Sequence, residues 1–206
     1  MKALCLLLLV VYSFSGFAQK RVEKSVLDSD ISNIRIDANS CFQVVLSTVT
    51  SQEIRVEAQM DGEYSPDLEL TLVEQGNTLV VNAGFHPEFK KPNDKLSAHK
   101  VVSISLDIAI PEYKNVTLYG TNTRVVADGN YKKLGITLSD GSCKLKNITE
   151  VVEVKTHSGD IIIYENAAVV TAESKYGKVS DNPIPSGHHQ YELNTVTGNI
   201  KLHKTE

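Results

Sequence analysis

The chain has 206 residues, a formal net charge of −4 and only 6% aromatic residues. This mild acidity excludes nucleic acid and anionic membranes as expected partners, because both attract basic surfaces. The length suffices for one domain with its own hydrophobic core.

The N-terminus has the pattern of a secretory signal peptide. Lys2 is followed by an apolar block over 3–11 and by small residues at 15–18. This pattern predicts a signal peptide at 1–18 with cleavage after Ala18. The apolar block is too short for a spanning helix, and the sequence contains no other candidate. We therefore expect an exported protein, with residues 19–206 forming a single all-β domain without a transmembrane segment.

The part of this domain before the repeat, 19–110, is rich in predicted strands. Apolar and polar residues alternate over 32–37, 42–44, 53–57, 68–72 and 102–110. A period of two indicates strands with one buried face. Pro111 ends the last of these, because proline cannot donate to a strand ladder.

Residues 84–99 interrupt this pattern. The segment contains Pro87, Pro92 and several charged residues and has little to bury, so it is predicted to be a surface loop. A tolerated insertion is the simplest interpretation, although binding residues are often found on such loops.

A repeat dominates 111–206. The glycines Gly141, Gly159, Gly177 and Gly198 are separated by 18, 18 and 21 residues, and one further step back leads to Thr123. Counted from these residues, four columns are apolar in all units except at Asp181. The columns contain Val116, Leu134, Val152, Val170 and Tyr191; Leu118, Ile136, Val154, Ala172 and Leu193; Val125, Cys143, Ile161, Val179 and Ile200; and Ala127, Leu145, Ile163, Asp181 and Leu202.

A fixed step of this size indicates stacked units that bury one face against their neighbours. The sequence therefore predicts a β-solenoid, similar to a parallel β-helix, with coils of about 18 residues in the C-terminal half, preceded by the strand-rich N-terminal half. Each glycine is expected at a turn between two strands, where it permits a positive φ angle. An antiparallel meander with a hairpin turn at Ser158-Gly159 is the competing topology.

Two stretches of sequence resemble the bacterial putative-adhesin family, which includes the domain called the auto-transporter adhesin head. They are the segment 108–120, with Pro111 and Gly120, and the turn sequences around Gly159 and Gly198. The resemblance covers about 31–202. It implies an exported β-solenoid-like domain of undetermined molecular function, and no catalytic residues. The chain departs from the family pattern at Thr123, at Ala127 and over 176–178.

An enzyme on a β-helix scaffold would need carboxylates that converge on one face. Asp140 and Asp160, beside two of the repeat glycines, are the only candidate acids that the repeat offers. Local hydrogen bonding to turn backbone explains them more simply. The sequence shows no pattern typical of calcium, zinc or phosphate binding, so no metal and no cofactor is expected.

The favoured hypothesis is a non-enzymatic adhesin or binding and structural protein of a bacterial envelope, located in the periplasm or at the cell surface. Its partner would be an envelope component, glycan or protein. A carbohydrate-active enzyme and a regulatory exodomain that binds a partner protein remain as alternatives. Cys41 and Cys143 are left after processing. Export permits a disulfide between them, and the sequence leaves this open.

Overall fold

The computed structural model describes residues 19–27, 30–89 and 102–205. The predicted signal peptide and most of the predicted loop at 84–99 lie outside this part of the chain. Within it the protein is all-β apart from a short 3₁₀ helix, η1 (Ser65–Asp67). No helix in these ranges is long and apolar enough to cross a membrane.

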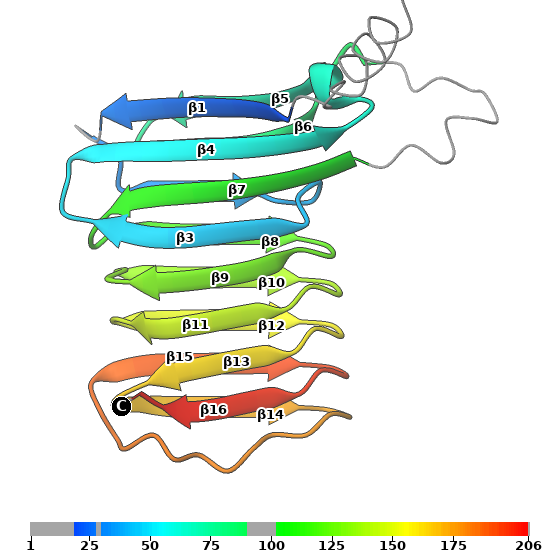
Figure 1. Cartoon of the computed structure of the whole chain (residues 1–206). Helices are drawn as coiled ribbons and strands as arrows, with labels where there is room; N and C mark the ends of the chain where they lie inside the picture. Colours follow the sequence, from blue (N-terminus) through cyan, green and yellow to red (C-terminus); the bar gives the residue numbers. More distant parts are fainter. Residues whose placement is uncertain (1–18, 28–29, 90–101, 206) are drawn as a thin grey trace, which may run out of the picture.

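The strands form two eight-stranded sheets that face each other (Figure 1). Sheet A has the order β1 (Lys20–Leu27), β4 (Glu53–Gly62), β7 (Val102–Pro111), β3 (Gln43–Val49), β9 (Arg124–Gly129), β11 (Cys143–Ile148), β13 (Ile161–Glu165) and β16 (Ile200–Lys204). Sheet B has the order β14 (Ala168–Ser174), β15 (His189–Thr195), β12 (Val151–Thr156), β10 (Lys133–Leu138), β8 (Asn115–Gly120), β2 (Asn33–Asp37), β6 (Thr78–Phe85) and β5 (Leu68–Gln75).

This architecture corrects the predicted fold class. A C-terminal solenoid preceded by a separate strand-rich half is wrong, because both sheets are mixed and contain strands from the whole chain. In sheet A, β3 pairs in parallel with β9, and in sheet B, β2 pairs in parallel with β8. The early strands have the same period-two pattern as the later ones, so their inner residues continue the same apolar rows and the sheets do not stop where the repeat starts.

Pairing is parallel through the repeat and antiparallel at the other end. β10 pairs with β8 and β12 at a constant step of 18 residues, as Ile136 pairs with Leu118 and Val154. Antiparallel pairs join β1 to β4, β4 to β7 and β5 to β6. The strands on either side of Gly159, β12 and β13, lie in different sheets, so the alternative hairpin at Ser158-Gly159 is not observed.

The units of the repeat do not stack in chain order. The final pair, β15 and β16, lies between the third unit and the fourth, so that Tyr191 pairs with both Val152 and Val170. The fourth unit is thereby displaced to the sheet edge, and Figure 1 shows its connection to β15 running along that edge. At this edge the fourth unit is open to solvent, since Asp181 is exposed and Val179 is 41% exposed. A polar residue is therefore compatible with the position at which the other units have an apolar one.

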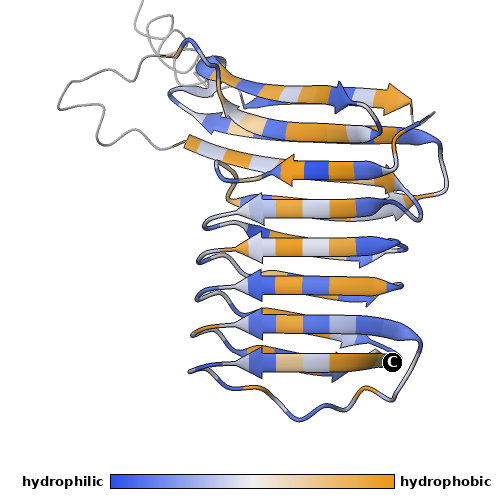
Figure 2. Ribbon diagram, turned by 180° about the vertical axis from the view of Figure 1, so that it is seen from behind, coloured by the Kyte–Doolittle hydropathy of each residue, from blue (hydrophilic) through white to orange (hydrophobic). Residues whose placement is uncertain are grey.

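Residues that point between the sheets form one continuous hydrophobic core. Val154, Ile161 and Ile163 are fully buried. Figure 2 shows apolar and polar residues alternating along the strands of sheet B, which faces the viewer, as expected when one side of each strand packs inward. Ile184, on the connection to β15, is also buried and joins this core at the lower edge.

Candidate binding pocket

The repeat glycines lie at the turns between strands of the two sheets, but their conformation differs from the prediction. Positive φ angles among the described glycines occur at Gly62, Gly76 and Gly129, so none of the four repeat glycines adopts one. They are required for a different reason, close approach of backbones. A Cβ atom at Gly159 would overlap with the carbonyl group of Gly141, and one at Gly198 would overlap with that of Gly159.

Asp140 and Asp160 accept hydrogen bonds at these turns. The Ser158 hydroxyl donates to Asp140 Oδ1. The Asn199 backbone N–H donates to Asp160 Oδ1 over 2.8 Å, and its side-chain amide donates to the same oxygen over 3.1 Å. Each carboxylate therefore ties its own turn to the adjacent one.

The two cysteines are buried and free. Cys143 lies in the ladder opposite Val125 and Ile161. Burial raises the pKa of the Cys41 thiol to about 12 and that of Cys143 further still. Both side chains are therefore protonated, unreactive core residues at neutral pH.

One polar network lies within the core near the C-terminus. The Tyr191 hydroxyl lies 2.6 Å from Glu165 Oε2 and 2.7 Å from the Ile148 carbonyl oxygen, and it accepts the Ile148 N–H over 3.1 Å. Tyr191 is 2% and Glu165 3% exposed. Burial and the hydrogen bond with Glu165 raise the pKa of Tyr191 far above its usual range. The network ties β15 of sheet B to the ends of β11 and β13 in sheet A.

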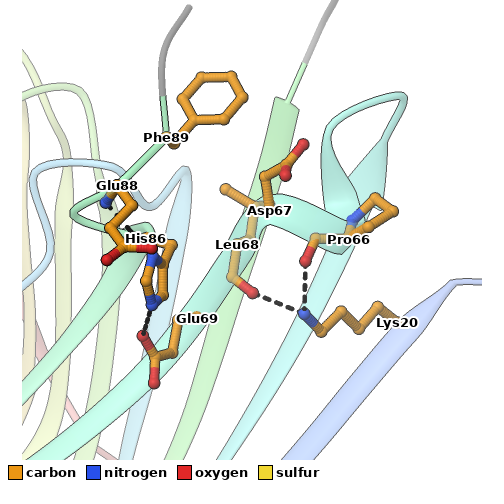
Figure 3. A pocket seen from close by; sticks show the side chains of 8 residues that line it. All are labelled: Lys20, Pro66, Asp67, Leu68, Glu69, His86, Glu88 and Phe89. Atoms are coloured by element: carbon orange, nitrogen blue, oxygen red, sulfur yellow. Dashed lines mark hydrogen bonds and ion pairs between the residues drawn. The ribbon is translucent and has the colours of Figure 1, made fainter.

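A hollow lies at the other end of the molecule, where β1, η1, β5 and the end of β6 meet (Figure 3). We call it the end pocket. Its volume is about 440 Å³, and it is lined by Lys20, Pro66, Asp67, Leu68, Glu69, His86, Glu88 and Phe89.

The wall formed by η1 depends on its short sequence Ser65-Pro66-Asp67. Proline fits the first turn of a helix, where its fixed φ angle is suitable and its missing N–H is not needed. The Asp67 N–H donates to the Tyr64 carbonyl over 3.0 Å and closes the turn. Lys20 crosses from β1 and donates to the carbonyls of Leu68 over 2.6 Å and Pro66 over 3.3 Å, which joins sheet A to this wall (Figure 3).

The opposite wall has an oriented histidine. The Glu88 N–H donates to His86 Nδ1 over 3.3 Å, which orients the imidazole ring. His86 Nε2 lies 3.8 Å from a Glu69 carboxylate oxygen (Figure 3). With Asp67 and Glu88, the pocket has three carboxylates against one ammonium group, whose protons are directed at backbone carbonyls.

Phe89, the aromatic residue that lines the pocket, belongs to a cluster of three rings. Phe85 and Phe89 stack with centroids 4.4 Å apart, and Tyr64 meets Phe89 edge to face at 5.3 Å. Phe85 remains 43% exposed. Carboxylates accept hydrogen bonds from hydroxyl groups, and phenyl rings stack on apolar faces of a ligand. In the described ranges, no three His, Cys, Asp or Glu side chains are placed so that together they could hold a metal ion.

The sequence indicated only part of this pocket. His86, Glu88 and Phe89 belong to the predicted loop at 84–99, although Gly84 and Phe85 complete β6 and only 86–89 of the remainder are described. Lys20 and residues 66–69 were not predicted as site residues. The sequence of β1 shows no clear alternation, and the pocket joins segments that lie far apart in the sequence. A sequence feature that could have indicated this wall of the pocket is the turn Ser65-Pro66-Asp67 beside a predicted strand.

No family model matches the chain, and no curated protein matches it. Among solved structures, the chain is similar to a putative cell adhesion protein from Clostridium sporogenes, with a TM-score of 0.67 at 14% identity over 91% of this chain and 100% of that one. It is more distantly similar to putative adhesins from Bacteroides fragilis (TM-score 0.41, 13% identity, 92% and 99% covered) and Parabacteroides merdae (0.35, 13%, 91% and 97%). At this identity the likeness to the Clostridium protein establishes a shared fold and nothing further.

Proposed function

We propose that this protein is an exported, non-enzymatic binding protein of a bacterial envelope, of the putative-adhesin type. The end pocket is the observation on which this proposal mainly rests. It places hydrogen-bond acceptors beside the half-buried phenyl ring of Phe89 in an open hollow, which suits the capture of a ligand. The fold shared with a putative cell adhesion protein supports the same function.

The positions of Asp140 and Asp160 favour binding over catalysis. Both carboxylates accept hydrogen bonds from neighbouring turns, which is the structural role of such residues beside glycines. A general acid or base would have to be aimed at a substrate instead.

The test is retention of the purified protein on immobilised envelope fractions, measured together with release of soluble products. We expect retention without turnover. The variants Glu69→Gln and Phe89→Ala should each weaken retention at least fivefold, because one removes a charged acceptor and the other a stacking ring. Glu23→Gln, on the exposed side of β1 outside the pocket, is the matched control and should bind as the unmodified protein does.

Two results would contradict the proposal. Equal retention of all variants would remove the end pocket as the binding site. Release of products that stops in an Asp140→Asn/Asp160→Asn variant would establish the enzyme alternative. Export is checked separately by cell fractionation and by sequencing the N-terminus, which is expected to start at Gln19.

A further inference from the structure

The outer face of sheet B contains two adjoining hollows. One, of about 310 Å³, is lined by Thr117, Tyr119, Lys133, Gly135, Ile136, Thr137, Glu153 and Lys155. The other, of about 280 Å³, is lined by Val151, Val152, Glu153, Val169, Thr171, Gln190, Tyr191 and Glu192. Because Glu153 lines both, they lie side by side across β8, β10, β12, β15 and β14, and together we call them the sheet B track.

The strand register shows how the track arises. One outward row runs across the five strands through Thr117, Gly135, Glu153, Glu192 and Thr171. Gly135 is the one member of this row without a side chain, and the first hollow lies over it. The gap is therefore a consequence of a single residue in the middle of a strand.

The fold does not require glycine at this position. A Cβ atom at Gly135 would meet nothing closer than 3.8 Å, and the residue has no positive φ angle. Glycine inside a strand costs about 0.5–1 kcal/mol and often marks a place where a ligand approaches the backbone. Gly135 thus differs from Gly159, which the stacking of backbones requires.

The walls of the track match a hydroxyl-rich and uncharged ligand. Tyr119 is 45% exposed at one end and offers a ring face, while Thr117 and Thr137 offer hydroxyls. Lys133 forms an ion pair with Glu153 over 2.7 Å, and Lys155 and Glu192 add one charge of each sign. Acceptors and donors alternate without an excess of either charge, so neither an anionic nor a cationic polymer is favoured.

The length of the track indicates an extended ligand. Neighbouring strands lie about 4.8 Å apart, so five strands span roughly 19 Å. A second copy of this chain is a poorer fit, since the cores of protein interfaces are depleted of charged groups. We infer that the sheet B track binds an extended, neutral glycan chain that crosses the strands. This inference rests on the proposed binding function and adds a second site and a ligand class to it.

The experiment is titration of the isotope-labelled protein with neutral tetrasaccharides, cellotetraose and tetra-N-acetylchitotetraose, followed by amide NMR shifts. Tetragalacturonate and the glucosamine tetramer are the charged probes. We expect at least one neutral tetramer to shift the amides of Gly135, Thr117 and Glu153, and to bind at least tenfold more tightly than the charged probes.

Two variants and a control sharpen the test. Gly135→Val fills the gap and should weaken binding at least tenfold without lowering the melting temperature, because valine favours strands. Tyr119→Ala should weaken binding severalfold. Thr71→Val, on the outer side of β5 and away from both hollows, should bind as the unmodified protein does.

Each contrary result has one meaning. Unchanged binding by Gly135→Val, or shifts confined to Glu69 and His86, would overturn the track and leave the proposed function intact. Retention on envelope fractions without binding of any neutral tetramer would do the same. Binding in the track without envelope retention would instead support the inference and count against the proposed function.

Discussion

The two ends of this molecule differ in how their strands pair and in how their turns are constrained. From β8 to β16 each strand pairs in parallel with neighbours of the same pattern, and backbones meet at glycine turns that leave no room for a Cβ atom. At the other end β1, β4, β5, β6 and β7 pair antiparallel in part, and a 3₁₀ turn connects β4 to β5. The end pocket lies at this irregular end. Inward and turn residues of the repeat are constrained by both neighbours, whereas side chains at the end and on the outer faces are free to serve binding.

The largest effect is expected when a side chain is placed at a repeat turn, which tests whether backbone stacking constrains these glycines. Gly159→Ala would drive Cβ into the carbonyl of Gly141. Because the overlapping atoms of Gly141 and Ser142 are backbone, no side-chain movement relieves the overlap, and we expect a loss on the order of 4 kcal/mol in the free energy of unfolding. Denaturant unfolding measures it.

The control is Gly135→Ala, in which the new Cβ has space. It should be neutral or slightly stabilising, since glycine is unfavourable inside a strand. A similar loss in both variants would show that stacking is not what distinguishes the repeat glycines.

The two buried thiols test what both regions share. Cys41, before the repeat, and Cys143, within it, belong to the same hydrophobic core. Folding raises both pKa values from 9.0, that of Cys41 to about 12. Above pH 9 the unfolded chain therefore loses these protons while the folded chain keeps them, so stability falls as pH rises. Two such groups give a loss of about 3 kcal/mol between pH 8 and pH 10.

Denaturant unfolding at both pH values, with a reductant present, tests this. A Cys41→Ala/Cys143→Ala variant should lose most of this pH dependence, whatever its stability at pH 8. If the slope stays unchanged in the variant, the ionisation belongs to other groups.

The sequence predicted the strands and the buried columns of the repeat more fully than it predicted their arrangement. Alternation fixes which residues point inward, and Val154 and Ile161 are buried as expected. It says nothing about the order of units, since every unit has the same apolar columns. The insertion of β15 and β16 before the fourth unit depends on the longer connection over 182–189, which passes around the edge.

The same limit applies to the first half of the chain. Ile34 and Ile36 fit a strand in any sheet, so their pattern gave no sign that β2 lies beside β8. The end pocket was still harder to predict from the sequence, because Lys20, Glu69 and His86 come together only when three separate segments have folded. Contacts at a fixed sequence step are visible in a sequence, and contacts between unrelated segments are not.

The inserted pair offers a third test. Tyr191→Phe removes the hydroxyl that bonds Ile148 and Glu165 and leaves buried polar groups unpaired. Such a loss costs about 1–3 kcal/mol, and we expect about 2 kcal/mol. Tyr119→Phe, with its exposed ring, is the matched control and should have little effect. Hydrogen exchange should show faster exchange in β15 of the Tyr191 variant, and equal protection there would mean that packing alone holds the inserted strand.

The smallest expected effect concerns the irregular end. Lys20→Met keeps the apolar stem and removes the ammonium that donates to the carbonyls of Leu68 and Pro66. Because that end is open to water, which can replace these bonds, we expect a loss of only about 1 kcal/mol. Lys24→Met on the same strand is exposed and should change less. A loss in Lys20→Met as large as that in Gly159→Ala would show that the irregular end is as tightly constrained as the repeat, and the contrast between a structural repeat and a permissive end would no longer hold.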